Sequence, residues 1–218
     1  MENRNFLDRA DAGKQLAEAL REAGHSFDFV FALVRGGVPV GLPVAREFAV
    51  PLVPMVVRKI GMPGQRELAL GAISEGGAIR WNADLTESGR FGEEELSRLR
   101  DKARAEVQEK IGRLRSGQPL PPVADKKILV VDDGAATGAT LLAAVDDLER
   151  MGAAVMVGLP VAPASFLRNL KRLGIPALIL KVPLDFQAVG EWYDDFREVT
   201  DGAVLLTLQQ SSPSPRKA

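Results

Sequence analysis

The segment 127–148 constrains the fold more than any other part of the chain. Four aliphatic residues lead directly into Asp132 and Asp133, a loop of Gly, Ala and Thr follows over residues 134–140, and a helical pattern of apolar residues begins at Leu141. This order predicts a buried strand, a tight turn and a helix that starts beside the end of the strand. Backbone N–H groups at such a turn bind phosphate, whereas two adjacent carboxylates repel it and suit hydroxyl groups or a metal ion. A ligand with a phosphate, a diol and a cation would satisfy all of these groups.

Strand and helix patterns alternate along the rest of the chain, which predicts an α/β fold with a parallel central sheet. The expected strands cover residues 29–34, 52–58, 127–131, 155–161 and 177–182. The expected helices cover residues 9–23, 38–48, 138–151 and 164–173. In addition, an antiparallel hairpin is expected where residues 70–73 and 78–81 flank Glu75-Gly76-Gly77.

Residues 92–115 interrupt this alternation with a long, highly charged segment. Its apolar residues recur at steps of three or four, which is typical of an amphipathic helix. Two interpretations stay open: the helix covers one face of a sheet, or it forms a dimer contact. A stiff, proline-rich connector follows over residues 118–122, and we expect a disordered tail at 211–218.

The composition excludes several classes of site. The 28 basic and 29 acidic side chains nearly cancel, so nucleic acid is not an expected partner. The sequence has no cysteine, which excludes disulfides and thiol catalysis, and its single histidine, His25, argues against a histidine metal site or a catalytic triad. No apolar run approaches the ~20 residues of a membrane span, and the N-terminal residues lack the pattern of a secretion signal. We therefore expect a cytoplasmic protein that does not contact the membrane.

Two common phosphate loops do not fit residues 134–140. A P-loop ends in Gly-Lys-Ser/Thr, and this loop contains no lysine. The dinucleotide fingerprint needs three glycines in a set spacing and an acid after the next strand, whereas here the acids precede the glycines. An acidic pocket like that of a response regulator would leave the run from Thr137 to Thr140 unexplained.

Residues 130–140, Val-Val-Asp-Asp-Gly-Ala-Ala-Thr-Gly-Ala-Thr, resemble the signature of the type I phosphoribosyltransferases. That signature is a hydrophobic strand, two acids, three small or variable residues and then Thr-Gly-x-Thr. The resemblance implies a Rossmann-like fold that binds phosphoribosyl pyrophosphate (PRPP). It implies that Asp132 and Asp133 receive the ribose hydroxyls. The 5′-phosphate would lie against Gly134, Ala135, Ala136, Thr137, Gly138, Ala139 and Thr140.

A second segment, Arg35-Gly36-Gly37, resembles the pyrophosphate loop of the same family. The guanidinium offers a planar fork of donors for phosphate oxygens, and the glycines let the backbone approach the ligand. Because related enzymes often have an unusual cis peptide in this loop, we expect one between Val34 and Arg35. The alternative is an ordinary glycine turn with a solvent-facing arginine.

A third segment follows the second expected strand. Arg58 and Lys59, with the Gly-x-x-Pro-Gly turn at 61–64, look like the basic pair and turn of adenine-type members. By this resemblance the two cations would neutralise pyrophosphate, and residues 60–72 would form a mobile cover that excludes water. The alternative is a basic surface at the end of a strand.

The acceptor would be recognised by a hood built from the chain ends. Residues 181–196 contain four aromatic side chains, so Trp192 and Tyr193 are candidates to stack on a flat heterocycle, and Lys181 to donate to an exocyclic oxygen. The alternative is that Trp192 and Phe196 only pack the hood onto the sheet. On the N-terminal side, Phe6, Asp8 and Arg9 are expected to close the hood.

Two departures from the family pattern bear on the acceptor. Oxopurine-specific members have an acid where this chain has Ala136, which counts against hypoxanthine and guanine. Adenine-type members have a tyrosine in the mobile loop, and the only tyrosine of this chain is Tyr193. A purine-like base is favoured, but the residues do not identify it.

The resemblance implies one domain over residues 1–210, with a parallel sheet flanked by helices. The core would cover about 25–182, the hood 1–12 and 183–210, and an inserted helical segment 82–122.

The implied reaction transfers 5-phosphoribosyl from PRPP to a nitrogenous base and releases pyrophosphate. The expected catalytic residues are Asp132, Asp133, Arg35 and Lys59. Mg²⁺ would be held mainly by PRPP, with no direct protein ligand and with the two acids nearby. Besides PRPP and a small heterocyclic base, we expect a second copy of the chain as partner, in a homodimer. The alternatives are a non-catalytic regulator that binds PRPP, and a phosphohydrolase.

Overall fold

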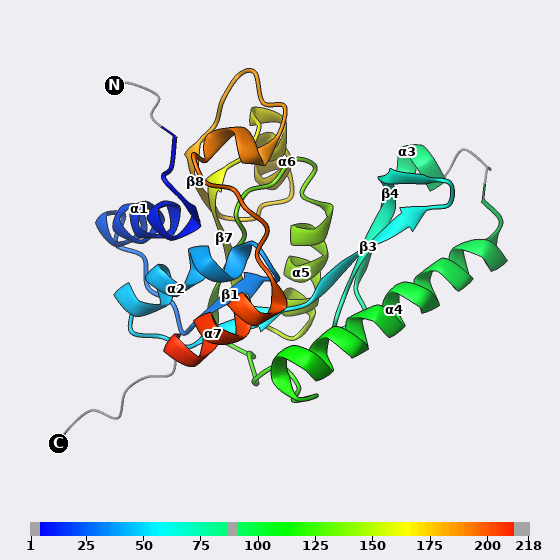
Figure 1. Cartoon of the computed structure of the whole chain (residues 1–218), viewed down its shortest axis with the longest axis horizontal. Coiled ribbons are helices and arrows are strands. Elements are labelled where there is room, and N and C mark those ends of the chain that lie inside the picture. The colour runs from blue at the N-terminus through cyan, green and yellow to red at the C-terminus, as the bar shows by residue number, and fades with distance from the viewer. Residues whose placement is uncertain (1–4, 87–90, 212–218) are drawn as a thin grey trace.

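A parallel sheet forms the middle layer of the protein. The computed structural model describes residues 5–86 and 91–211, and within these residues the central sheet has five strands in the order β2-β1-β6-β7-β8 (Figure 1). The expected tail at 211–218 lies outside the described residues, except for Ser211. The strands are β1 (Phe29–Leu33), β2 (Leu52–Met55), β6 (Lys127–Val131), β7 (Ala154–Val161) and β8 (Ala177–Lys181). The predicted α/β class and parallel sheet are therefore confirmed.

Helices cover both faces of this sheet. Because successive strand residues point to opposite faces, Val30 and Ala32 pack on one side of β1, and Phe31 and Leu33 on the other. Of the four helices expected from the sequence, two lie on the first side and two on the second. These are α1 (Arg9–Glu22) and α2 (Gly37–Glu47) on the first face, and α5 (Ala139–Arg150) and α6 (Ala164–Arg172) on the second.

A side lobe extends from one edge of the core (Figure 1). In the described part of the chain it consists of an antiparallel sheet in the order β3-β4-β5, a short helix and a long helix that lies along β3. The hairpin expected around Glu75-Gly76-Gly77 is present, because Ile73 pairs with Ile79 and Gly71 with Trp81. The elements are β3 (Val57–Met62), β4 (Gln65–Ser74), β5 (Ile79–Trp81), α3 (Ala83–Thr86) and α4 (Glu93–Arg115).

The prediction of one strand over residues 52–58 is wrong. β2 ends at Met55, which pairs with Leu33, the last residue of β1. Beyond Leu33 the chain turns away, so Val56 has no neighbouring strand to pair with in the central sheet. The chain therefore passes directly into β3, where Val57 pairs with Ser74 of β4. The segment expected as a mobile cover, residues 60–72, lies in this β3–β4 hairpin.

The long amphipathic helix predicted at 92–115 is confirmed as α4. Its buried side chains Ala103, Val107, Ile111 and Leu114 pack toward the side lobe and not onto the central sheet. The interpretation that α4 covers a sheet face is therefore confirmed, and the sheet that it covers is the small antiparallel one, not the central one. The dimer interpretation stays a prediction.

Near the carboxyl edge of the sheet, the N-terminal segment lies against the segment that follows β8. Phe6 forms a bridge with Tyr193, next to the short helix η1 (Val189–Trp192). The final helix, α7 (Asp201–Ser211), falls inside the range expected for the hood, but it packs against α2. Of the helices in residues 5–86 and 91–211, none is both long enough and apolar enough to cross a membrane.

Candidate functional site

The phosphate loop joins β6 to α5 at the carboxyl edge of the central sheet. Ala136 and Thr137 are exposed at its tip, and Thr140 is half-buried in the first turn of α5. Gly138 has a φ of +73°, and a Cβ at this position would lie 1.9 Å from the ring of Phe166. Only glycine therefore fits at the start of the helix, so this position keeps the loop tight against the N-terminus of α5.

The acid pair is held in surroundings that disfavour its charge. The carboxylate of Asp132 accepts from the backbone N–H of Asp133 over 2.9 Å, and Oδ2 of Asp133 accepts from Nε of Arg9 over 2.8 Å. Burial raises the pKa of Asp132 well above its usual range, and the charge of Asp133 raises it further. Burial also raises the pKa of Asp133, against the opposing effect of Arg9. Oxygen acceptors of this kind are suited to hydroxyl groups.

The expected pyrophosphate loop lies against the acid pair. The predicted cis peptide between Val34 and Arg35 is confirmed. A Cβ at Gly36 would lie 2.0 Å from Oδ2 of Asp133, and one at Gly37 would lie 2.7 Å from the carbonyl oxygen of Val131. The two glycines thus allow a contact between β1 and β6 loops that no larger residue would permit. The side chain of Arg35 is 39% exposed and pairs with Glu198, so the role of this loop in holding pyrophosphate stays a prediction.

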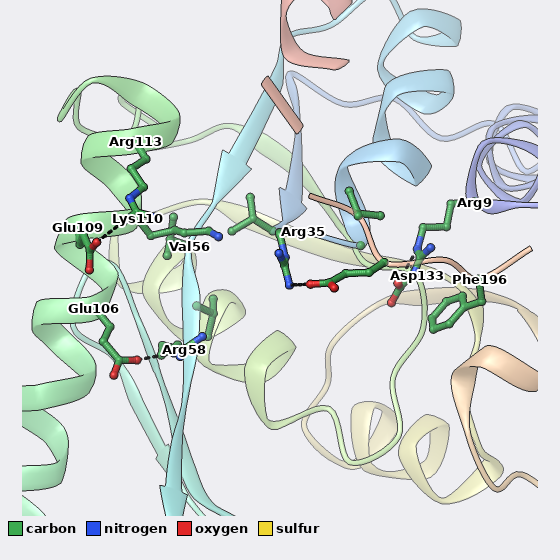
Figure 2. A pocket seen from close by; sticks show the side chains of 15 residues that line it. Arg9, Arg35, Val56, Arg58, Glu106, Glu109, Lys110, Arg113, Asp133 and Phe196 are labelled. Carbon is green, nitrogen blue, oxygen red and sulfur yellow. Dashed lines mark hydrogen bonds and ion pairs between the residues drawn. The ribbon is translucent and has the colours of Figure 1, made fainter. Parts of the chain in front are cut away.

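Two cavities adjoin Arg35. The larger, of about 890 Å³, is lined by Arg9, Arg58, Asp133 and Phe196, and α4 closes its far side with Glu106, Glu109, Lys110 and Arg113 (Figure 2). The smaller, of about 770 Å³, lies along β3 and is lined by Lys59, Asp132 and Thr140. Arg35, Arg58 and Glu106 belong to the walls of both. The structure therefore brings Arg35, the basic pair Arg58 and Lys59, and the acid pair together from the ends of β1, β3 and β6, whereas residues 134–139 do not line either cavity.

Ion pairs within the chain engage the cations of these walls. Arg35 donates to Glu198 over 2.5 Å, and Arg58 donates to Glu106 over 2.6 Å (Figure 2). Lys110 of α4 donates to Asp201 over 2.5 Å. An anionic ligand that binds here must therefore exchange places with carboxylates of the protein.

The structure places the expected acceptor residues elsewhere. Trp192 and Tyr193 are buried in a cluster with Phe6, and the ammonium of Lys181 lies 4.2 Å from the centre of the Phe6 ring. The hydroxyl of Tyr193 donates to the carbonyl oxygen of Asp133 over 2.5 Å, and burial raises the pKa of this tyrosine. Trp192, Tyr193 and Lys181 are not among the residues that line the two cavities. Trp192 thus shows the packing role that the sequence left open, because its apolar ring is more stable buried in the cluster than exposed.

Phe196 is the hood aromatic that reaches the larger cavity. The guanidinium carbon of Arg9 lies 3.8 Å from the centre of its ring. Reasoning from sequence did not identify Arg9 as the partner of Asp133, nor Glu198 as the partner of Arg35, since those pairs are separated by 124 and 163 residues. No local pattern marks contacts at such a separation.

The side chains of this site supply only some of the ligands that a magnesium ion needs. Among residues 5–86 and 91–211 there is no group of three or more histidine, cysteine or acidic side chains that could hold a metal ion. Asp132 and Asp133 supply the hard oxygen atoms that Mg²⁺ prefers. That the ion is held mainly by a phosphorylated ligand, with the acid pair beside it, stays a prediction.

The fold and the site define an α/β protein with an acid pair and a tight glycine loop at the carboxyl edge of its parallel sheet. The family model described as the phosphoribosyl transferase domain matches residues 3–164. The chain therefore belongs to the phosphoribosyl transferase family, and it has the type I fold.

Three known proteins are similar over nearly the whole chain. The crystal structure of TT1426 from Thermus thermophilus has a TM-score of 0.78 and 37% identity, and the match covers 95% of this chain and 99% of that one. The Mycobacterium tuberculosis proteins MT0597 (strain CDC 1551) and Rv0571c (strain H37Rv), which carry provisional phosphoribosyl transferase names, are each 35% identical over 207 residues. That match covers 94% of this chain and 47% of each relative, so the chain spans about half the length of the curated relatives it matches.

Proposed function

We propose that this protein is a phosphoribosyltransferase that transfers 5-phosphoribosyl from PRPP to a nitrogenous base and releases pyrophosphate. The observation that carries the proposal is the contact between the acid-pair loop and the Arg35 loop. This contact supports the proposal because carboxylate oxygens that suit a diol lie beside a guanidinium that suits a diphosphate, next to a helix N-terminus that suits a phosphate.

The reaction breaks the bond between C1 of the sugar and the pyrophosphate oxygen and forms a bond from C1 to a nitrogen of the base. Positive charge develops on the sugar ring and negative charge on the leaving group. Arg35, Arg58 and Lys59 would stabilise the leaving group, and Asp132 and Asp133 would orient the diol and stabilise the sugar cation. Mg²⁺ carried by PRPP would supply further charge neutralisation next to the acid pair.

For the acceptor we propose a purine-like base in the larger cavity, and for the assembly a homodimer. Ala136 in place of an acid favours an adenine-like base over an oxopurine. Phe196, and not Trp192 or Tyr193, supplies the aromatic wall of that cavity.

The test is pyrophosphate release from PRPP with Mg²⁺ across a panel of bases, with wild-type protein and Asp133→Asn. We expect release with one base or a few closely related ones, and loss of turnover in Asp133→Asn. Tight PRPP binding without turnover would instead support a non-catalytic regulator. Hydrolysis of simple phosphate esters would support a phosphohydrolase.

A further inference from the structure

Arg9 joins three segments that are far apart in the sequence. It begins α1, its Nε donates to Oδ2 of Asp133 over 2.8 Å, and its Nη1 donates to the carbonyl oxygen of Arg197 over 2.9 Å. Its guanidinium also covers the ring of Phe196 (Figure 2). The side chain is 11% exposed. A planar guanidinium engaged on two edges and one face has little freedom, so it fixes the geometry of its partners.

Asp133 is confined from two further directions. The backbone at Gly36 is so close to Oδ2 that a Cβ would overlap it, and the hydroxyl of Tyr193 donates to the carbonyl oxygen of Asp133. Its side chain is 16% exposed, and it faces the larger cavity. The orientation of this carboxylate therefore depends on its neighbours, and Arg9 is the one that binds the carboxylate itself.

We propose that Arg9 is a positioning residue for phosphoribosyl transfer that acts through Asp133, an inference that rests on the proposed function. By binding Oδ2 it turns the carboxylate toward the sugar hydroxyls. Because the same guanidinium contacts Phe196 and Arg197, the hood must be packed in place before Asp133 is in its working geometry. The donor site is thus completed by the N-terminal helix and the hood together.

A purely structural role for Arg9, as an anchor of the hood, predicts something different. Loss of an anchor would lower the melting temperature and the amount of folded protein, but folded molecules would keep the kcat and the KM for PRPP of the wild type. A positioning role changes kcat and the KM for PRPP in fully folded protein. Rescue by a conservative variant also separates the two.

The experiment compares Arg9→Gln and Arg9→Lys with the matched control Arg21→Gln. Arg21 lies on the same helix, where it pairs with Glu47 over 3.2 Å, and its side chain is 56% exposed. The kcat and the KM for PRPP are measured with the base that gives the fastest release of pyrophosphate, and PRPP affinity is measured by calorimetry.

Because small misplacements of reacting groups lower rates by about 100-fold, we expect kcat/KM for PRPP to fall by about 30- to 100-fold in Arg9→Gln. Arg9→Lys should recover about tenfold of this loss, because lysine restores the charge without the planar fork. Arg21→Gln should stay within about twofold of the wild type.

A double variant tests whether Arg9 acts through Asp133. If it does, Arg9→Gln adds little to the effect of Asp133→Asn, because the two residues form one unit. Additive effects would overturn the inference, as would wild-type kcat and KM in Arg9→Gln. If Arg9→Gln does not fold, Arg9→Lys decides: wild-type kinetics and PRPP affinity in that variant would overturn the inference. A wild-type protein that neither binds nor turns over PRPP would instead refute the proposed function.

Discussion

At the scale of single residues, Asp132 carries a charge that the fold disfavours. Burial and the charge of Asp133 raise its pKa, so the folded protein holds this proton more tightly than the unfolded chain does. The stabilisation by this group is therefore complete below the unfolded pKa and is lost as the pH rises through the raised folded pKa. Wherever the pH is high enough to ionise this carboxyl in the folded protein, its charge lowers the free energy of unfolding, as is common where function requires a buried charge.

Asp132→Asn should therefore raise the melting temperature at neutral pH while it lowers turnover. Its amide oxygen still accepts from the N–H of Asp133, so only the charge is removed. In a chain of this size, about 1 kcal/mol corresponds to about 2–4 °C. Thermal unfolding between pH 4 and pH 8 should show the difference from wild type growing with pH. The control is Asp101→Asn, whose side chain is 61% exposed. A difference independent of pH would contradict this account.

Glu198 is a competitor for Arg35. The two side chains lie 2.5 Å apart, and Glu198 is largely exposed, so a diphosphate has to displace it. Exposed ion pairs contribute about 0.2–1 kcal/mol, so Glu198→Gln should tighten pyrophosphate binding by about two- to fivefold. Inhibition by pyrophosphate measures this. Glu94→Gln, which breaks the exposed pair with Arg98 on α4, is the matched control. Weaker pyrophosphate binding in Glu198→Gln would show that Glu198 helps to hold Arg35 in place.

Site residues that stand in a contiguous motif can be predicted from the sequence, whereas the residues that contact them from distant parts of the chain cannot. The acid pair, Gly36 and Arg35 belong to short contiguous runs whose chemistry can be inferred from the sequence, and all of them line the two neighbouring cavities. Arg9 and Glu198 become part of the site only through the fold. Trp192 and Tyr193 were assigned to the acceptor because aromatic rings stack on heterocycles, but burial in the Phe6 cluster accounts for both rings.

At the scale of elements, α4 shows what the spacing of apolar residues can predict and what it cannot. Its apolar spacing predicted the helix and its bounds to within a residue or two. Which sheet it covers depends on the break at Val56, which follows from the length of β1 and not from residues 52–58 themselves. The same break brings α4 to the wall of the larger cavity, where Lys110 extends toward the Arg35 loop and Arg113 pairs with Glu109 (Figure 2).

Lys110 links α4 to the donor site through Asp201. It donates to Asp201 over 2.5 Å and lowers the pKa of that carboxyl, and Asp201 lies 3.9 Å from the guanidinium of Arg35. Lys110→Met removes a cation from the cavity and leaves Asp201 to pair with Arg35. Opposite charges near a protein surface interact by a few kcal/mol at most, so we expect the KM for PRPP to rise by about three- to tenfold. Steady-state kinetics measure this, with Arg98→Met on the exposed part of α4 as control. An unchanged KM would exclude α4 from donor binding.

At the scale of the whole molecule, a polar joint connects the side lobe to the core. The buried carboxylate of Asp147 accepts from the N–H groups of Gly76 and Ala78, each over 2.8 Å. Arg115, at the end of α4, donates to Glu75 over 2.5 Å and to the carbonyl oxygen of Pro54 over 3.1 Å. The sequence predicts the hairpin and the long helix of this lobe, but not that they join β3 in a separate lobe, because the sheet to which a strand belongs is decided by its pairing partners and not by its own residues.

Arg115→Met should weaken this joint, because it removes the contact with Pro54 of the core and the ion pair with Glu75 inside the lobe. The side chains of Arg115 and Glu75 are 11% and 3% exposed, so the variant leaves a buried carboxylate without its cation. Burial already raises the pKa of Glu75 and Arg115 opposes that effect, so the variant should raise this pKa further. Breaking a buried pair costs about 3–5 kcal/mol, which denaturant unfolding should show as a lower free energy of unfolding. Arg113→Met, in an exposed pair with Glu109, should cost less than about 1 kcal/mol.

The double variant Arg115→Met/Glu75→Leu distinguishes two effects of losing Arg115. One is the cost of an unpaired buried carboxylate, and the other is a change in how the side lobe is held on the core. Apolar replacements of a buried ion pair are often neutral or stabilising, so the double variant should regain most of the free energy lost in Arg115→Met. If the pair also sets the angle of the side lobe, turnover should remain low in the double variant, because β3 and α4 carry Arg58, Lys59 and Lys110 into the cavity walls. Recovery of both stability and turnover would show that the lobe is positioned by Asp147 and by apolar packing on α5, and that the charge of Arg115 contributes only to stability.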